Sequence, residues 1–250
     1  MELQLVNKFL SNWEHRDIVD GVLLTGSRNI GMASNNSDID LQILISDSNL
    51  RERGNQVVDG ILIEYFANPT AHIMKYLEQE KAAFHRPTVR MYATGKILLD
   101  KHGDLAQACQ AANEYFKLPL PPMSAGEIEA AKYSIWDCFD DLQELYEHNR
   151  TSFPYVYHLN LNKVLTLYAR FLGAELTAPS KQEVLFSSPE FRTRYVIPDF
   201  PDSIFAGLFL ECVSAQEHAE MYHSFAQLTE HALTAMGGFY IDGWRSRIHP

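Results

Sequence analysis

The chain has 250 residues, of which 46% are hydrophobic and 21% charged, so it is long and apolar enough for one large folded domain or two small ones. Its formal net charge of −11 argues against a general nucleic-acid binder, because contacts with phosphates need a basic surface. The same charge suits a site for a cationic small molecule.

The cysteines and the N-terminal segment indicate the compartment. The three cysteines, at positions 109, 138 and 212, are far apart and form no disulfide framework, which favours a reducing compartment. The first residues combine charged side chains with apolar ones at helical spacing, unlike a signal peptide. No apolar run approaches the roughly 18 residues that span a bilayer. We therefore expect a cytoplasmic protein without a membrane partner.

Helices and strands alternate through the first hundred residues. The expected elements are a helix over 2–16, strands over 21–25 and 38–46, a hairpin over 56–66, helices over 70–83 and 87–93, a strand over 96–100 and a helix over 104–117. The hairpin turns at Asp59-Gly60, because Asp-Gly between apolar runs is a strong signal for a two-residue turn.

The tract LPLPPM (118–123) separates two halves, since proline continues neither a helix nor a central strand. Apolar residues at helical spacing then predict helices over 125–149, 155–172 and 203–235, ended by Gly237-Gly238. The sequence therefore predicts an α+β fold. A small mixed β-sheet domain flanked by helices covers residues 1–117, and an all-α helical-bundle domain covers 118–250.

Two aspartates follow a Gly-Ser turn in the stretch LLTGSRNIGMASNNSDIDLQILI (23–45). Asp38 and Asp40 are two apart on an expected strand, so their side chains lie on one face with Gln42 behind them. The alternate residues Ile39, Leu41, Ile43 and Ile45 then point into the core. A pair of carboxylates can bind one hard divalent cation or two, and two such ions can clamp an in-line phosphoryl displacement.

A third carboxylate lies in the apolar run ILIEYF, where Glu64 is the single charged residue. If this strand lies beside 38–46, Glu64 reaches the same place as the aspartates. The alternative is that Glu64 points outward from a half-exposed strand.

The Gly-Ser turn fits a phosphate site. Gly26 lets the backbone approach a ligand closely, and a turn that opens a helix presents free N–H groups to phosphate oxygens. Ser27 adds a hydroxyl donor. Arg28 either pairs with a phosphate or is an ordinary surface arginine, and Ser37 either orients the site or starts the strand.

Competing motifs explain these residues less well. The spacing of GSRNIGMA matches a P-loop, but Met32 and Ala33 replace the required Lys and Ser/Thr. A metal-dependent glycosyltransferase also uses an Asp-x-Asp motif, and that interpretation accounts for neither the Gly-Ser turn nor Glu64.

Taken in order, Gly26-Ser27, Asp38-Ile39-Asp40 and Glu64 resemble the polymerase-β-type nucleotidyltransferase superfamily. The layout of a small catalytic domain followed by a helical domain is similar to the aminoglycoside and lincosamide nucleotidyltransferases. The resemblance implies that Asp38 and Asp40 bind two Mg²⁺ ions, and that Glu64 completes the metal site or takes the proton from the acceptor hydroxyl. It implies that Gly26 and Ser27 hold the β- and γ-phosphates.

The implied reaction transfers a nucleoside monophosphate, AMP from ATP, to a hydroxyl of a small cationic acceptor such as an aminoglycoside-like compound, with release of pyrophosphate. A role in antibiotic resistance would follow from such an acceptor.

The helical half offers a candidate acceptor surface. Asp137, Asp141 and Glu144 share one face of the helix expected over 125–149, which is either an ordinary solvated face or an acidic wall for a cationic acceptor. Trp136 would add a cation–π contact. In similar enzymes a lysine of the helical domain contacts the triphosphate, so Lys181 is a candidate for that contact.

A second hypothesis is a non-catalytic binding protein or antitoxin-type partner that keeps the nucleotidyltransferase fold. The complete set of three acids and the attached helical domain favour the enzyme, because a minimal antitoxin lacks the acceptor wall.

Overall fold

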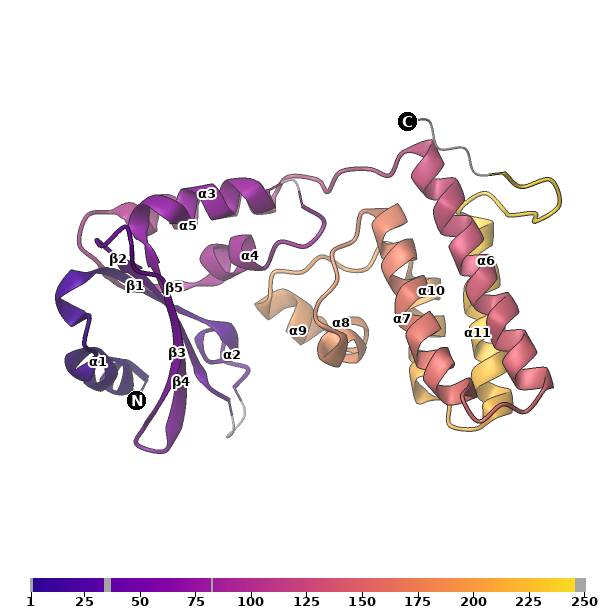
Figure 1. Ribbon diagram of the computed structural model, residues 1–250, viewed down its shortest axis with the longest axis horizontal. Coiled ribbons are helices and arrows are strands. Elements are labelled where there is room, and N and C mark those ends of the chain that lie inside the picture. The colour runs from indigo at the N-terminus through magenta and orange to yellow at the C-terminus, as the bar shows by residue number, and fades with distance from the viewer. Residues whose placement is uncertain (1, 34–36, 82, 246–250) are drawn as a thin grey trace. The chain divides into compact units, whose positions relative to one another are not determined.

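A mixed five-stranded sheet organises the first half of the chain in the computed structural model, which describes residues 2–33, 37–81 and 83–245 (Figure 1). The strands are β1 (Val19–Thr25), β2 (Ile39–Ile45), β3 (Glu52–Val58), β4 (Ile61–Pro69) and β5 (Lys96–Asp100). Their order is β3-β4-β2-β1-β5, with β2 and β4 parallel and the other neighbours antiparallel. Strand β4 therefore belongs both to the parallel pair with β2 and to the hairpin with β3.

The β3–β4 hairpin turns at the predicted residues. Asp59 and Gly60 have φ angles of 50° and 82°, and two consecutive positive φ angles are the mark of a type I′ turn. This turn pairs Val58 with Ile61, and so fixes the register of the whole hairpin.

Helices cover both faces of the sheet (Figure 1). Helix α1 (Glu2–Asn12) packs on one face, and α3 (Thr70–Glu80), α4 (Pro87–Thr94) and α5 (Asp104–Phe116) pack on the other. On the α1 face, Ile39, Leu41, Ile43 and Ile45 of β2 are fully buried, as the alternation predicts. The expected helix over 2–16 ends earlier, at Asn12, and a 3-10 turn (Arg16–Ile18) follows.

The second half of the described chain is helical. Its main helices are α6 (Ala125–Glu147), α7 (Phe153–Leu172), α10 (Ser203–Ser214) and α11 (His218–Ala235), packed around one apolar core (Figure 1). A capping box at Ser124 and Glu127 begins α6. The predicted α+β class is confirmed: a small mixed sheet flanked by helices precedes a helical region.

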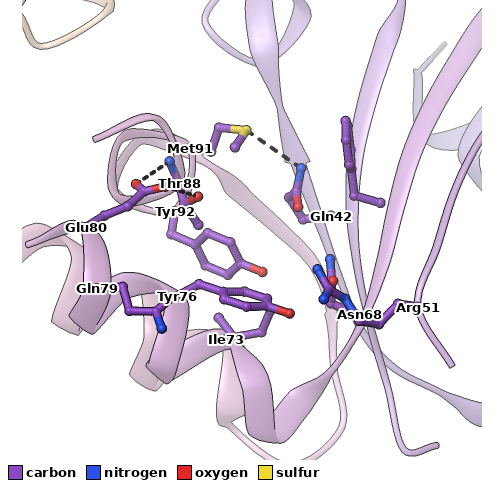
Figure 2. Close-up of a pocket in the computed structure, with 11 residues that line it drawn as sticks. Gln42, Arg51, Asn68, Ile73, Tyr76, Gln79, Glu80, Thr88, Met91 and Tyr92 are labelled. Carbon is purple, nitrogen blue, oxygen red and sulfur yellow. Dashed lines mark hydrogen bonds between the residues drawn. The ribbon is translucent and has the colours of Figure 1, made fainter. Parts of the chain in front are cut away.

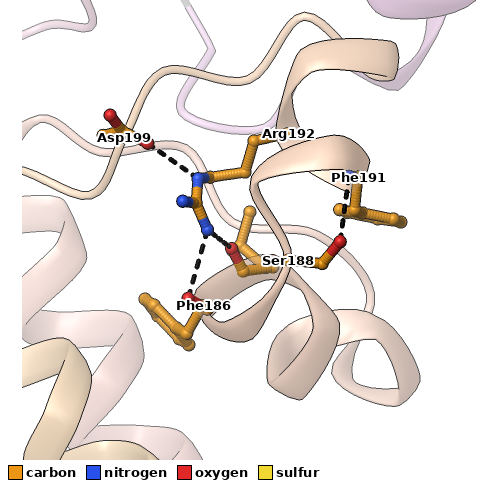
Figure 3. Close-up of polar contacts among 6 residues, drawn as sticks. Phe186, Ser188, Phe191, Arg192 and Asp199 are labelled. Atoms are coloured by element: carbon orange, nitrogen blue, oxygen red, sulfur yellow. Dashed lines mark hydrogen bonds and ion pairs between the residues drawn. The ribbon is translucent and has the colours of Figure 1, made fainter.

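Two short helices, α8 (Gln182–Ser187) and α9 (Pro189–Arg194), lie in the segment between 172 and 203, for which the prediction gives no helix bounds. Figure 3 shows how polar contacts fix them: the Arg192 guanidinium donates to the Leu185 and Phe186 carbonyls and to Asp199, and the Ser188 hydroxyl accepts from the Phe191 N–H. Six-residue helices show too little periodicity to stand out in a sequence.

Contacts divide the chain into two compact units. The first comprises Met1–Pro119 with Thr193–Val196, and the second comprises Leu120–Arg192 with Ile197–Pro250. Among the described residues, no helix combines the length and the apolar character that crossing a membrane requires.

Candidate metal centre

Three carboxylates from two strands converge in the first unit. Asp38 directly precedes β2, Asp40 lies in β2, and the parallel pairing of β2 with β4 sets Asp40 opposite Glu64. One carboxylate oxygen from each residue lies within 4.8 Å of the other two. The structure therefore brings together the three acids that the sequence singles out.

Gly26 leaves the space that the Asp40 carboxylate fills. Its φ of 72° is in the left-handed region, which favours glycine. A Cβ at position 26 would lie 1.8 Å from Oδ2 of Asp40, far closer than a carbon and an oxygen that are not bonded to each other can approach. Thr25, the residue before, pairs with Asp40 across β1 and β2. The Gly-Ser turn and the metal centre are thus one structural unit, because a side chain at position 26 would displace the carboxylate.

Arg28 supports the segment that carries Asp38. Its side chain is almost fully buried, and its Nε donates to the Ser37 carbonyl at 2.9 Å and to the Asp38 carbonyl at 3.1 Å. These bonds hold the chain where it enters β2. Contacts of Arg28, Ser27 or Ser37 with a phosphate stay predictions.

The end of the turn helix α2 (Gly26–Asn29) is also held from elsewhere in the first unit. The amide of Asn29 donates to the Thr94 carbonyl at the end of α4. Arg194 donates to the carbonyls of Ile30 and Gly31, at 2.7 and 3.1 Å. Arg194 is far away in the sequence, so no local pattern points to this contact.

Arg53 is a residue near the site that the sequence analysis missed. Its Nη2 and Nε lie 2.7 and 3.2 Å from Oε1 of Glu64, and its guanidinium lies 4.8 Å from the centre of the Phe66 ring. The signal was present in the Asp59-Gly60 turn, because counting back from that turn pairs Arg53 with Phe66. The Arg53 side chain is exposed, whereas that of Glu64 is mostly buried. A bound cation would therefore compete with a solvent-accessible arginine for the Glu64 carboxylate.

The donor set fits a hard divalent cation. Carboxylate oxygens are the protein ligands of Mg²⁺, which keeps water or phosphate oxygens in its other positions. Asp38, Asp40 and Glu64 would hold such an ion, and the close packing against Gly26 leaves a backbone rather than a side chain beside it.

A second acidic group, of Glu14, His15 and Glu52, also gathers within 4.8 Å. Glu52 there accepts hydrogen bonds from the Trp13 indole and the Tyr65 hydroxyl, which tie β3 and β4 to the segment after α1. Burial, followed by the bond to Glu52, raises the pKa of Tyr65. The hydrogen bonds of Glu52 to the α1 face therefore account for the position of this second acidic group.

The remaining predicted site residues belong to the second unit. Asp137 and Asp141 lie on α6, and burial together with the charges of Asp137 and Asp140 raises the pKa of Asp141. Trp136 packs against Tyr133 and Phe239, with ring centres 6.1 Å apart in each pair. Lys181 ends a 3-10 turn (Pro179–Lys181). Their roles with an acceptor or a nucleotide stay predictions.

Comparison with known proteins adds little. No family model matches the chain, and no curated protein matches it. Among solved structures, a nucleotidyltransferase-like protein from Exiguobacterium sibiricum 255-15 aligns over 94% of this chain and 75% of its own. The two are 11% identical and the TM-score is 0.44, a similarity that carries no argument about activity.

Proposed function

We propose that this protein is a metal-dependent nucleotidyltransferase. The single observation that carries the proposal is the packing of Gly26 against Asp40 beside Asp38 and Glu64. A Gly-Ser turn and three convergent acids form one unit, in the order along the chain that the superfamily resemblance requires.

In the proposed reaction, a hydroxyl oxygen of the acceptor forms a bond to the α-phosphorus of an NTP, for which we propose ATP. The bond from that phosphorus to the bridging oxygen breaks, and pyrophosphate leaves. The proton of the hydroxyl passes to Glu64 or to solvent. When bound, magnesium supplies charge neutralisation at the phosphoryl centre.

The chain's own residues bind and orient the reactants. Asp38 and Asp40 hold the cations, with two ions as the expected number, and Glu64 either completes this set or serves as the base. Gly26 and Ser27 contact the β- and γ-phosphates, where a backbone without a side chain permits close approach. Lys181 adds a triphosphate contact.

For the acceptor we propose a small hydroxylated cation, bound by the acidic side chains of α6. Burial, followed by the charges of Asp137 and Asp140, raises the pKa of Asp141, so a cation placed among these carboxylates would relieve their mutual repulsion. An aminoglycoside-like amino sugar has this chemistry.

The test is incubation with each NTP, Mg²⁺ and a panel of amino sugars while pyrophosphate is followed. We expect release with the wild type and loss of release in Asp38→Asn and Asp40→Asn. Asp17→Asn, which changes an exposed carboxylate outside the site, serves as the matched control and should keep full activity.

Release that survives both aspartate substitutions would reject the metal assignment. Turnover of UDP-sugars without any NTP would favour a glycosyltransferase. No turnover with any donor, together with tight binding of a partner protein, would favour the antitoxin-type alternative.

A further inference from the structure

A pocket of about 360 Å³ lies on the face of the sheet that carries Asp40 and Glu64 (Figure 2). Gln42 and Phe66 line it, and each follows one of these carboxylates by two positions on the same strand. Residues two apart on a strand lie about 7 Å apart. A ligand in the pocket would therefore lie next to the candidate metal centre, and all lining residues belong to the first unit.

The side-chain amide of Gln42 lines this pocket and makes few hydrogen bonds within the described part of the protein. Gln42 is 5% exposed, and its side-chain Nε2 donates a hydrogen bond to the sulfur of Met91 at 3.7 Å. A thioether is a weak acceptor, whereas buried amides in native proteins normally have strong partners. The amide of Gln42 thus keeps most of its hydrogen-bonding capacity.

Tyr92 provides the second, independent observation. Its side chain is 1% exposed, and its hydroxyl has no hydrogen-bond partner among the described residues. Burial raises the pKa of Tyr92, so the hydroxyl stays protonated at neutral pH. Figure 2 shows this hydroxyl directed toward the side of the pocket where Gln42 and Asn68 lie. An unpaired buried hydroxyl destabilises a folded protein, which suggests that its partner is a ligand.

The charges around the pocket do not favour a cation. Both oxygens of Glu80 accept hydrogen bonds from Thr88 and Val89 at the start of α4. Arg51 lies at the rim with its guanidinium 5.3 Å from the centre of the Tyr76 ring. The Glu80 carboxylate is therefore engaged in hydrogen bonds within the protein, and the exposed charge at the pocket is the positive charge of Arg51.

The other lining groups match a flat ring with hydrogen-bonding edges. Side-chain amides such as those of Gln42 and Asn68 pair with the edges of nucleobases, and aromatic faces such as Phe66 and Tyr76 stack on rings. The volume suits a small molecule.

We propose that this pocket binds a planar, uncharged, hydrogen-bonding ring of the nucleobase class, held by Gln42 and Tyr92. The ring belongs either to the NTP donor or to a nucleoside-like acceptor. The inference rests on the proposed function for the position of the ring beside the reacting phosphate, and the binding itself requires no turnover.

The test is calorimetric titration of the full chain with adenosine, guanosine, cytidine and uridine, and with the four NTPs plus Mg²⁺. The variants are Gln42→Leu and Tyr92→Phe. We expect each to weaken binding of the preferred ring by about threefold to tenfold, the usual effect of losing one hydrogen bond.

Tyr65→Phe is the matched control, because its hydroxyl has a protein partner on the opposite face of the sheet. It should lower Tm and leave ring binding unchanged. Tyr92→Phe should do the reverse: it should keep or raise Tm, since the hydroxyl that it removes has no partner, and it should weaken binding. A purely structural tyrosine would show the pattern of the control.

The same titrations distinguish the two sources of the ring. If the ring is that of the donor, the variants weaken NTP binding and the nucleoside competes with the NTP. If it is that of the acceptor, NTP binding is unchanged and nucleoside and NTP bind together.

The proposal is overturned if none of the nucleosides or NTPs binds, or if both variants bind them as the wild type does. Failure of the proposed function gives a different result. If the protein binds nucleosides through Gln42 and Tyr92 but never releases pyrophosphate, the inference about the pocket stands and the proposed transferase activity is rejected.

Discussion

The two faces of the sheet in the first unit differ in the side chains that β2 contributes to them. On the α1 face, the four odd-numbered residues of β2 from 39 to 45 are isoleucines and a leucine, all fully buried. On the other face, the alternating positions are Asp40, Gln42 and Leu44, of which only the last joins the apolar core under α3, α4 and α5. The same strand thus contributes a complete core on one side and an incomplete one on the other.

The difference shows where stability and function are separated. Packing explains every side chain of β2 on the α1 face. It explains neither the convergence of three acids nor the buried amide and hydroxyl on the opposite face. Polar groups that packing does not require are candidates for binding, because they carry a stability cost that a ligand can offset.

Among the predictions that distinguish the two faces of the sheet, the largest effect is expected from Asp40→Asn. We expect transfer activity to fall by about 10³-fold or more, equivalent to about 4 kcal/mol, because the substitution removes a charge that holds the cation. Stability in denaturant should stay the same or rise, since a carboxylate close to two others repels them. A large loss of stability with activity retained would place Asp40 among structural residues.

The opposite pattern is expected for Leu41→Ala, one residue along the same strand. Leu41 is fully buried, so its truncation should lower the free energy of unfolding by about 2–5 kcal/mol in urea titrations. Leu62→Ala is the control, because Leu62 is 40% exposed on β4. Equal losses at both positions would contradict the assignment of the core to the α1 face.

Gly26→Ala tests the link between the turn and the metal centre. The positive φ and the contact with Asp40 predict a loss of about 1–3 kcal/mol in stability. Cation affinity should fall at the same time, because the added methyl displaces the carboxylate. Gly103→Ala has a positive φ without any close neighbour, so it should cost stability but keep cation affinity. Unchanged affinity in Gly26→Ala would separate the turn from the site.

A smaller effect is expected from Arg53→Gln. The substitution removes a positive charge that competes for Glu64, so Mn²⁺ should bind about twofold to fivefold more tightly, the scale of an exposed ion pair. Titration followed by electron paramagnetic resonance measures this change, with the exposed Arg16→Gln as control. Weaker binding in Arg53→Gln would mean that the arginine supports the site.

The smallest effect concerns the acids of α6, which belongs to the second unit. Because burial and neighbouring charges raise the pKa of Asp141, the folded state binds its proton more tightly than the unfolded state does. Asp141→Asn should therefore raise stability at pH 7, by less than about 0.5 kcal/mol for this exposed position. The gain should disappear below pH 4, where the carboxyl is protonated in both states. A gain that persists at pH 3 would exclude charge as its cause.

Local patterns predicted much of the first unit. The alternation in 38–46, the Asp59-Gly60 turn and the strand over 96–100 depend on neighbouring residues, and each lies where the sequence places it. The convergence of the three acids depended on a condition that local patterns leave open, namely that β4 lies beside β2. The parallel pairing of these strands, which sets Asp40 opposite Glu64, meets that condition.

Other features depend on contacts between distant residues. Arg28 was expected as a phosphate ligand or a surface residue. Its nearly complete burial and its hydrogen bond to the Ser37 carbonyl arise only once the turn has folded. The contact of Arg194 with Ile30 spans more than half of the chain. The unpaired hydroxyl of Tyr92 is a property of the surroundings that α3 and α4 create, which no periodicity reveals.

The claim that three convergent carboxylates form the cation site is tested most directly by Mn²⁺ binding in two triple variants. One carries Asp38→Asn, Asp40→Asn and Glu64→Gln, and the other carries Asp137→Asn, Asp140→Asn and Asp141→Asn. Both change the net charge equally. We predict that the first loses tight Mn²⁺ binding and the second keeps it, whereas equal loss in both, or loss only in the second, would contradict the account.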